Sequence, residues 1–210
     1  MKMKYISIAT IIAFLFASCG QNTTETVSTN EPVEEVVPEP VVETYTLAEG
    51  STLDWKGYEE GKEEGHHHSG TVKIKSGSVE TTDGKITGGN FTIGMDEIAY
   101  VVGASNGGEV TPDNEIAGKV LGHFTDSLFL NNISYPEAGF AILSSDENGV
   151  TGELTFAGSA LSIVVPGTPA IEEGKLSHEA EFDLDLSSAS AYLTESGWKI
   201  RMNLSLIATK

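Results

Sequence analysis

Gly103 to Gly107 is the segment that comes nearest to a catalytic motif. It matches the Gly-x-Ser-x-Gly pattern, in which Ser105 would be the nucleophile of a hydrolase. That pattern needs a strand before the serine and a helix after it, whereas the residues from Gly108 to Pro112 are typical of a loop. We therefore expect a glycine-rich turn, and hydrolysis through Ser105 is the disfavoured alternative.

Three consecutive histidines at 66–68 could hold a metal ion. In an extended strand His66 and His68 share one face, and His123 or His178 could complete a site with them. Several glutamates flank the run, however, and a solvated hairpin or the rim of a barrel has the same composition. We favour the rim and keep metal binding as the alternative.

The N-terminal segment is expected to contain a signal peptide and a membrane anchor. Lys2 and Lys4 precede an uncharged apolar run from Ile6 to Phe16, which is too short to span a membrane. The run ends in Phe-Ala-Ser-Cys, which resembles a bacterial lipobox with Cys19 as the lipidated residue. The alternative is an ordinary signal peptide with a chance cysteine. We favour lipidation, because Cys19 is the only cysteine of the chain. Residues 1–18 would then be removed, and the protein would be anchored to a membrane of the cell envelope.

A change of composition separates a tether from a domain. Residues 19–43 contain no aromatic residue and no Lys or Arg, but are rich in Glu and Pro. Such a segment cannot bury enough apolar surface to fold, so we expect an extended, disordered tether. A recognition tail is the open alternative. The domain is expected to occupy residues 44–210.

The charge of the chain excludes one class of partner. Its 12 Lys and Arg and 31 Asp and Glu give a formal net charge of −19. Binding to nucleic acid requires basic residues that displace the counterions of the phosphates. We therefore expect no nucleic-acid partner, and no docking on anionic lipid through a basic surface.

Hydrophobic residues alternate with polar ones through most of the domain. The pattern is clearest from Trp198 to Ala208 and from Ala180 to Leu186, and turn residues such as Asp83-Gly84 separate the runs. Alternation of this kind is typical of antiparallel sheets with one buried face. Four-residue spacing of apolar residues occurs only near 113–128, where we expect one or two short helices.

Several segments resemble one protein family. Residues 123–140 begin with His-Phe-Thr-Asp-Ser and continue to Tyr-Pro and Phe, and Val150 to Gly158 has the order Val-Thr-Gly-Glu-Leu-Thr-Phe-Ala-Gly. Both segments resemble signatures of the YceI-like (polyisoprenoid-binding) family. Leu53 to Gly57 and Gly88 to Met95 resemble its opening strands.

The resemblance implies an all-β fold, an extended lipocalin-like antiparallel β-barrel of about eight strands. Its lumen would hold a long isoprenoid, such as a quinone or a polyprenyl phosphate, and no other cofactor is expected. Four departures from the family pattern leave the preferred head group open. They are Leu128, Leu130, Ala160 and Leu186.

The candidate ligand contacts are aromatic side chains of the strands and the signature, with polar groups at the rim. They are Trp55, Phe91, His123, Phe124, Phe129, Tyr135, Phe140, Phe156, Phe182 and Trp198. The favoured function is a membrane-tethered carrier or buffer of a lipid-like molecule, without turnover. The alternatives are a structural lipoprotein whose barrel is filled by its own side chains and, less favoured, a hydrolase. Whether two barrels pair stays open.

Overall fold

The computed structural model describes residues 38–210, apart from the side chains of residues 191 and 192. The signal peptide, Cys19 and most of the expected tether therefore lie outside the described residues. The elements in chain order are β1 (Val42–Leu47), β2 (Thr52–Glu59), β3 (His67–Thr82), β4 (Lys85–Ser105), β5 (Gly108–Val110), α1 (Glu115–Thr125), β6 (Glu137–Asp146), β7 (Gly149–Phe156), β8 (Ser159–Pro166), β9 (Ala170–Glu172), β10 (Lys175–Leu184), α2 (Ala191–Ser196) and β11 (Trp198–Thr209). Strand β1 begins two residues before the expected boundary at 44, because Val42 already pairs with Thr82.

The strands form one antiparallel sheet with eight positions around a barrel. Its order is β8-β7-β6-β4-β3-β1-β11-β10-β9. Strand β2 pairs with the same neighbours as β1, namely β3 and β11, so β1 and β2 occupy one position in succession. Strands β5 and β9 are three-residue additions beside β4 and β10. The expected antiparallel barrel of about eight strands is confirmed.

Tight hairpins connect several neighbouring strands. In four two-residue turns the first residue has φ between 47° and 53° and the following glycine has φ between 74° and 80°. Positive φ at both positions is the geometry of a type I′ turn, whose twist matches that of the strands. The turns are Asp83-Gly84, Asn106-Gly107, Ala157-Gly158 and Glu173-Gly174. Since the second turn joins β4 to β5, no helix follows Ser105, and the expected glycine-rich turn is confirmed.

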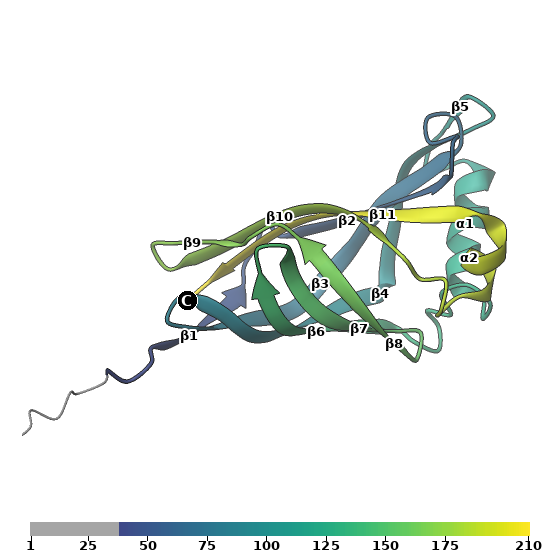
Figure 1. Cartoon of the computed structure of the whole chain (residues 1–210). Helices are drawn as coiled ribbons and strands as arrows, with labels where there is room; N and C mark the ends of the chain where they lie inside the picture. Colours follow the sequence, from purple (N-terminus) through teal and green to yellow (C-terminus); the bar gives the residue numbers. More distant parts are fainter. Residues whose placement is uncertain (1–37) are drawn as a thin grey trace, which may run out of the picture. The chain divides into compact units, whose positions relative to one another are not determined.

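Both helices lie at one end of the barrel, while β9, the start of β1 and the C-terminus lie at the other (Figure 1). Helix α1 lies in the predicted region, and the side chain of Asn114 caps it by accepting a hydrogen bond from the amide of Ile116 at 2.9 Å. This helix meets the expectation of one or two short helices near 113–128, whereas α2 lies elsewhere in the chain and was not predicted. Helix α2 has only six residues between the cap Ser190 and Gly197, so it is too short to show a helical period.

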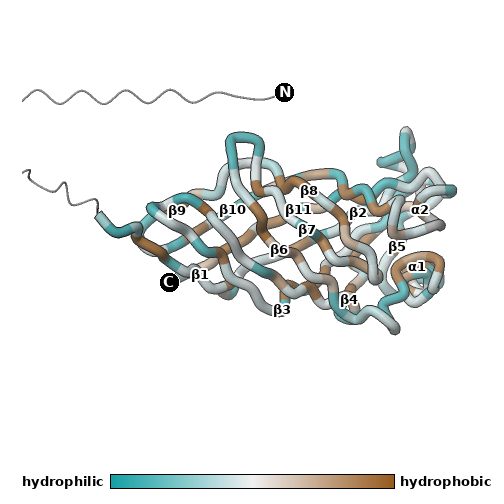
Figure 2. Tube along the Cα trace, turned by 60° about the horizontal axis from the view of Figure 1, so that its bottom comes forward, coloured by the Kyte–Doolittle hydropathy of each residue, from teal (hydrophilic) through white to brown (hydrophobic). Residues whose placement is uncertain are grey.

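Apolar side chains of the strands point into the barrel. Figure 2 shows hydrophobic residues recurring in short blocks along the strands. They form two contiguous clusters, one toward the helices and one toward β1 and β9. In the second cluster Tyr45, Val79 and Leu176 are each only 1% exposed, and Tyr45 and Val79 are direct partners in the ladder between β1 and β3. These side chains are therefore shielded from solvent at this end of the barrel.

Glycines allow close approach of strands in the curved part of the sheet, which leads to a test. A methyl group on Gly70 would lie 1.8 Å from the carbonyl oxygen of Ala99, beside an irregularity in the β3–β4 ladder. Because a backbone atom cannot move aside, we expect Gly70→Ala to lower the free energy of unfolding by about 3 kcal/mol in urea titrations.

The matched control is Gly118→Ala on the exposed side of α1, where a methyl group would meet nothing within 4 Å. It should raise the free energy of unfolding by roughly 0.5–1 kcal/mol through helix propensity. Equal effects of the two substitutions would contradict the proposed strand geometry.

Candidate functional site: an apolar lumen with a polar mouth

Three cavities follow one another inside the barrel. The deep cavity, about 110 Å³, is lined mainly by β3, β4, β6, β7, β8, β10 and β11 and includes Val79 and Leu176. The middle cavity, about 90 Å³, includes Met95 and Phe156. The mouth, about 310 Å³, lies beneath α1 and includes Trp198.

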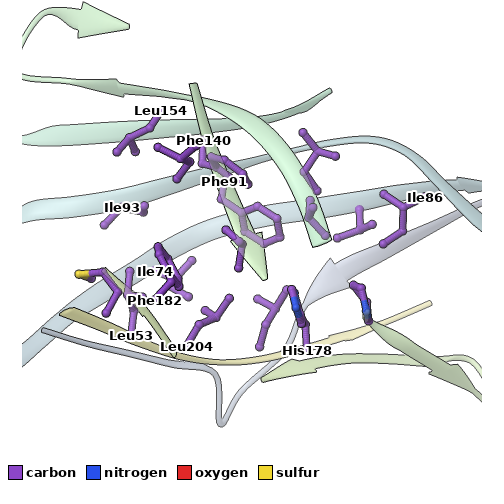
Figure 3. A pocket seen from close by; sticks show the side chains of 18 of the residues that line it. Leu53, Ile74, Ile86, Phe91, Ile93, Phe140, Leu154, His178, Phe182 and Leu204 are labelled. Atoms are coloured by element: carbon purple, nitrogen blue, oxygen red, sulfur yellow. The ribbon is translucent and has the colours of Figure 1, made fainter. Parts of the chain in front are cut away.

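The three cavities follow one another along the interior of the barrel, which we call the lumen, and neighbouring cavities share walls. The deep and middle cavities have five lining residues in common, and the middle cavity and the mouth have four. The shared residues are Leu53, Ile93, Leu154, Leu184 and Met202 for the first pair, and Trp55, Phe124, Phe129 and Ile200 for the second. All side chains that line the deep cavity are apolar except His178 (Figure 3). Apolar cavities of this size can hold a slim hydrocarbon chain away from water, but they have no room for a bulky ring system.

Most of the predicted ligand contacts line this lumen. Phe91, Phe140 and Phe182 line the deep cavity; Trp55, Phe124, Phe129 and Phe156 line the middle one; and Trp55, His66, His68, His123, Phe124, Phe129 and Trp198 line the mouth. Tyr135 lines none of the three, since it is 41% exposed and lies beside Gly158 in the β7–β8 turn. The aromatic rings thus surround the lumen rather than fill it.

The mouth contains a small aromatic and imidazole cluster. The Nδ1 atom of His68 lies 2.8 Å from the hydroxyl of Tyr100, and the imidazole stacks on the indole of Trp198 with 5.7 Å between ring centroids and 13° between planes. His66 contacts the same indole edge-on and lies 3.0 Å from a carboxylate oxygen of Glu59. The three rings thus pack together and form part of the wall of the mouth.

Metal binding by the histidine run finds no support in this geometry. Within residues 38–210, no three His, Cys, Asp or Glu side chains converge on a common point where a metal ion could be held. His66 and His68 do lie near each other, with 6.0 Å between ring centroids, as the shared strand face predicts. His66 lies beside the carboxylate of Glu59 and His68 beside the phenol of Tyr100.

Two lysines that the sequence did not single out also line the mouth. Lys119 comes from α1 and Lys199 from β11, and both are exposed. Lys119 forms an ion pair with Glu115 at 3.3 Å, which is weak at such exposure. With His66 and His123 they make the mouth the polar end of an otherwise apolar passage. Only the packing of α1 over β11 shows this, since the two segments are far apart in sequence.

Burial, together with the smaller effect of the neighbouring His66 and His67, lowers the pKa of His68 to about 4. Its ring is therefore neutral at pH 7. The unfolded chain, with an ordinary histidine pKa near 6.5, binds a proton in the pH window between these values. Stability contributed by the neutral ring is thus present at pH 7 and is lost as the pH falls toward 4.

We expect the free energy of unfolding to fall by about 2 kcal/mol between pH 7 and pH 5 because of His68. The substitution His68→Gln removes the titration while keeping a polar group near Tyr100. Urea titrations of the variant at the two pH values should show a clearly smaller difference than those of the wild type. The same difference in both proteins would assign the effect to other groups.

No helix among residues 38–210 has the length and hydrophobicity needed to cross a membrane.

Comparisons by sequence find no matching family model and no curated relative. Solved structures do match. Burkholderia cenocepacia BcnA aligns with a TM-score of 0.51 and 15% identity over 76% of this chain and 96% of that chain. A polyisoprenoid-binding domain from Saccharophagus degradans has a TM-score of 0.49 and 9% identity over 80% and 99% of the two chains. The YceI protein of Campylobacter jejuni has a TM-score of 0.42 and 16% identity over 73% and 84%.

At these identities the likeness concerns the fold alone. The chain therefore shares the fold of BcnA, and YceI proteins are among the solved structures that it resembles.

Proposed function

We propose that the chain is a YceI-like lipid-binding protein that holds one long apolar chain in its barrel, without turnover. The observation that carries the proposal is the row of cavities inside the barrel, with apolar deep and middle cavities and a polar mouth. Removing hydrocarbon from water would drive binding at about 25 cal/mol per Å² of apolar area. The resemblance of residues 123–140 to the family signature supports an isoprenoid as the class of ligand.

The orientation of the ligand follows from the two ends of the lumen. The mouth offers Lys119, Lys199 and imidazole groups, whereas the deep cavity is almost wholly apolar. A charged or strongly polar head group would stay at the mouth, because its burial in the deep cavity would cost several kcal/mol. A quinone and a polyprenyl phosphate both have such a head, and both remain candidates.

The length of the lumen limits the bound chain. Trp198 at the mouth and Leu206 in the deep cavity are eight residues apart on β11, which corresponds to about 27 Å along the strand. A strand tilt of about 40° reduces this to about 20 Å along the barrel axis. C–C bonds of about 1.5 Å in a zigzag advance about 1.3 Å per carbon, so an extended main chain of roughly 16 carbons, as in four isoprene units, covers this distance.

The structural alternative, a barrel filled by its own side chains, is disfavoured by the same cavities. The aromatic residues expected to close the lumen are those that line it. We therefore propose lipid binding as the single function, and we test it with a substitution whose larger side chain fills the lumen.

Leu154→Trp should abolish binding, because Leu154 lies where the deep and middle cavities meet and is 5% exposed. Native mass spectrometry with geranylgeraniol should give a dissociation constant at least tenfold higher than that of the wild type. The control is Leu143→Trp on the outer face of β6, where the side chain is 62% exposed. Wild-type binding by a folded Leu154→Trp protein, with cooperative thermal unfolding, would refute a ligand in the lumen.

The proposal includes anchoring through Cys19, which is outside the described residues. Expressed in a bacterium with its own leader, the wild type should partition into the detergent phase of Triton X-114. Cys19→Ser should remain in the aqueous phase, because several acyl chains at about 0.8 kcal/mol per CH₂ would be lost. Equal partitioning of the two proteins would remove the anchor and leave lipid binding untouched.

A further inference from the structure

His178 is an unusual side chain for its place in the barrel. It lies on β10, is 5% exposed, and is the single polar side chain among the residues that line the deep cavity. Figure 3 shows its ring in the wall of that cavity, among leucine, isoleucine and phenylalanine side chains. A leucine at this position would continue the apolar pattern of Leu176 and Phe182, so the imidazole needs an explanation.

One nitrogen of the ring has a structural role. The Nε2 atom of His178 donates a hydrogen bond to the carbonyl oxygen of Pro166 at 2.8 Å. Pro166 is the last residue of β8, and across residues 38–210 no ladder of backbone hydrogen bonds joins β8 to β10. The bond therefore links two strands that lack the usual pairing. Because a carbonyl can only accept, Nε2 carries the proton, and in the neutral ring Nδ1 is left as an acceptor.

The other nitrogen has no such role. In the described part of the chain, Nδ1 of His178 forms no hydrogen bond with protein. Among residues 38–210, Nδ1 of His178 is also not one of the unpartnered polar side-chain atoms that are fully buried, which are those of Trp55, His67 and Thr81. The acceptor is thus unpaired, on a residue whose side chain lines the deep cavity.

The deep cavity and the mouth therefore present two separate polar points to one ligand. Since His178 pairs with Leu206 across the β10–β11 ladder, it lies about 20 Å along the axis from Trp198. A hydrocarbon end placed against Nδ1 would leave the acceptor unsatisfied, which costs binding energy, whereas a hydroxyl would donate to it. A charged group at this depth would be disfavoured by the apolar surroundings.

We propose that His178 is a hydrogen-bonding site for a hydroxyl group at the far end of the ligand, so that the bound lipid is polar at both ends. The ligand class is a chain of about 16 carbons with an anionic or strongly polar head at the mouth and an alcohol at its terminus. This inference rests on the proposed lipid binding and names its preferred substrate class. The bond from Nε2 to Pro166 holds the ring so that Nδ1 keeps its place.

The test compares hexadecanoate with 16-hydroxyhexadecanoate, which differ only in the terminal hydroxyl. Their carboxylate keeps the head at the mouth, so neither acid can bind in the reverse direction at low cost. Isothermal titration of the purified protein should give about fivefold tighter binding of the hydroxy acid, the effect of one hydrogen bond. In His178→Phe the ratio of the two dissociation constants should fall to about one, whatever the change in the affinity for hexadecanoate itself. His178→Gln, which retains a donor and an acceptor, should restore part of the preference.

Each other outcome overturns the inference. Equal affinity of the two acids for the wild type, or an unchanged preference in His178→Phe, would show that Nδ1 meets no hydroxyl. If His178→Phe weakened the binding of both acids equally, His178 would act only through its structural hydrogen bond with Pro166. Failure of the wild type to bind hexadecanoate or geranylgeraniol would instead refute the proposed function itself.

Discussion

The backbone hydrogen-bond ladders hold the wall of the barrel, and the lumen is the space that its inward side chains leave unfilled. Every neighbouring pair from β8 through β10 in the sheet order is held by an antiparallel ladder. Collapse onto the empty space would require breaking ladders and exposing unpaired amide and carbonyl groups, each of which costs free energy when buried. The apolar surface inside is therefore held apart although it would gain from contact.

The large aromatic rings leave the lumen open because they pack over glycines of the neighbouring strands. Gly77 pairs with Phe91 between β3 and β4, and a methyl group on Gly77 would lie 2.0 Å from the phenyl ring. Similarly, a methyl group on Gly152 would lie 2.3 Å from the ring of Phe140 on the adjacent strand. Both rings thus lie flat against the neighbouring backbone, where they cover a glycine and line the deep cavity. Aromatic side chains that would fill the core of an ordinary protein line the cavity in this barrel.

The alternation of hydrophobic residues was sufficient to predict the class of fold, because a period of two is a property of each strand alone. It also predicted the inward side of β11, and the turn residues between the runs predicted the turn at Asp83-Gly84. It could not predict that α1 lies over β11 and brings Lys119 and Lys199 to one mouth, because such contacts depend on the curvature of the whole sheet. Likewise His178 has the alternation of any inward residue, and only the missing β8–β10 ladder reveals the use of its Nε2 atom.

Selectivity in such a lumen has to come from its ends. Apolar burial depends on area and not on chemical identity, so chains of equal apolar area gain nearly the same free energy from the walls. The cost of ordering a flexible chain also grows with its length and is similar among them. What differs between ligands is the match of a few polar groups with fixed partners, and a mismatch leaves a buried group unpaired. The barrel fixes the distance between the mouth and His178. It can therefore discriminate between ligands by the spacing of their polar groups, which the apolar walls alone cannot do.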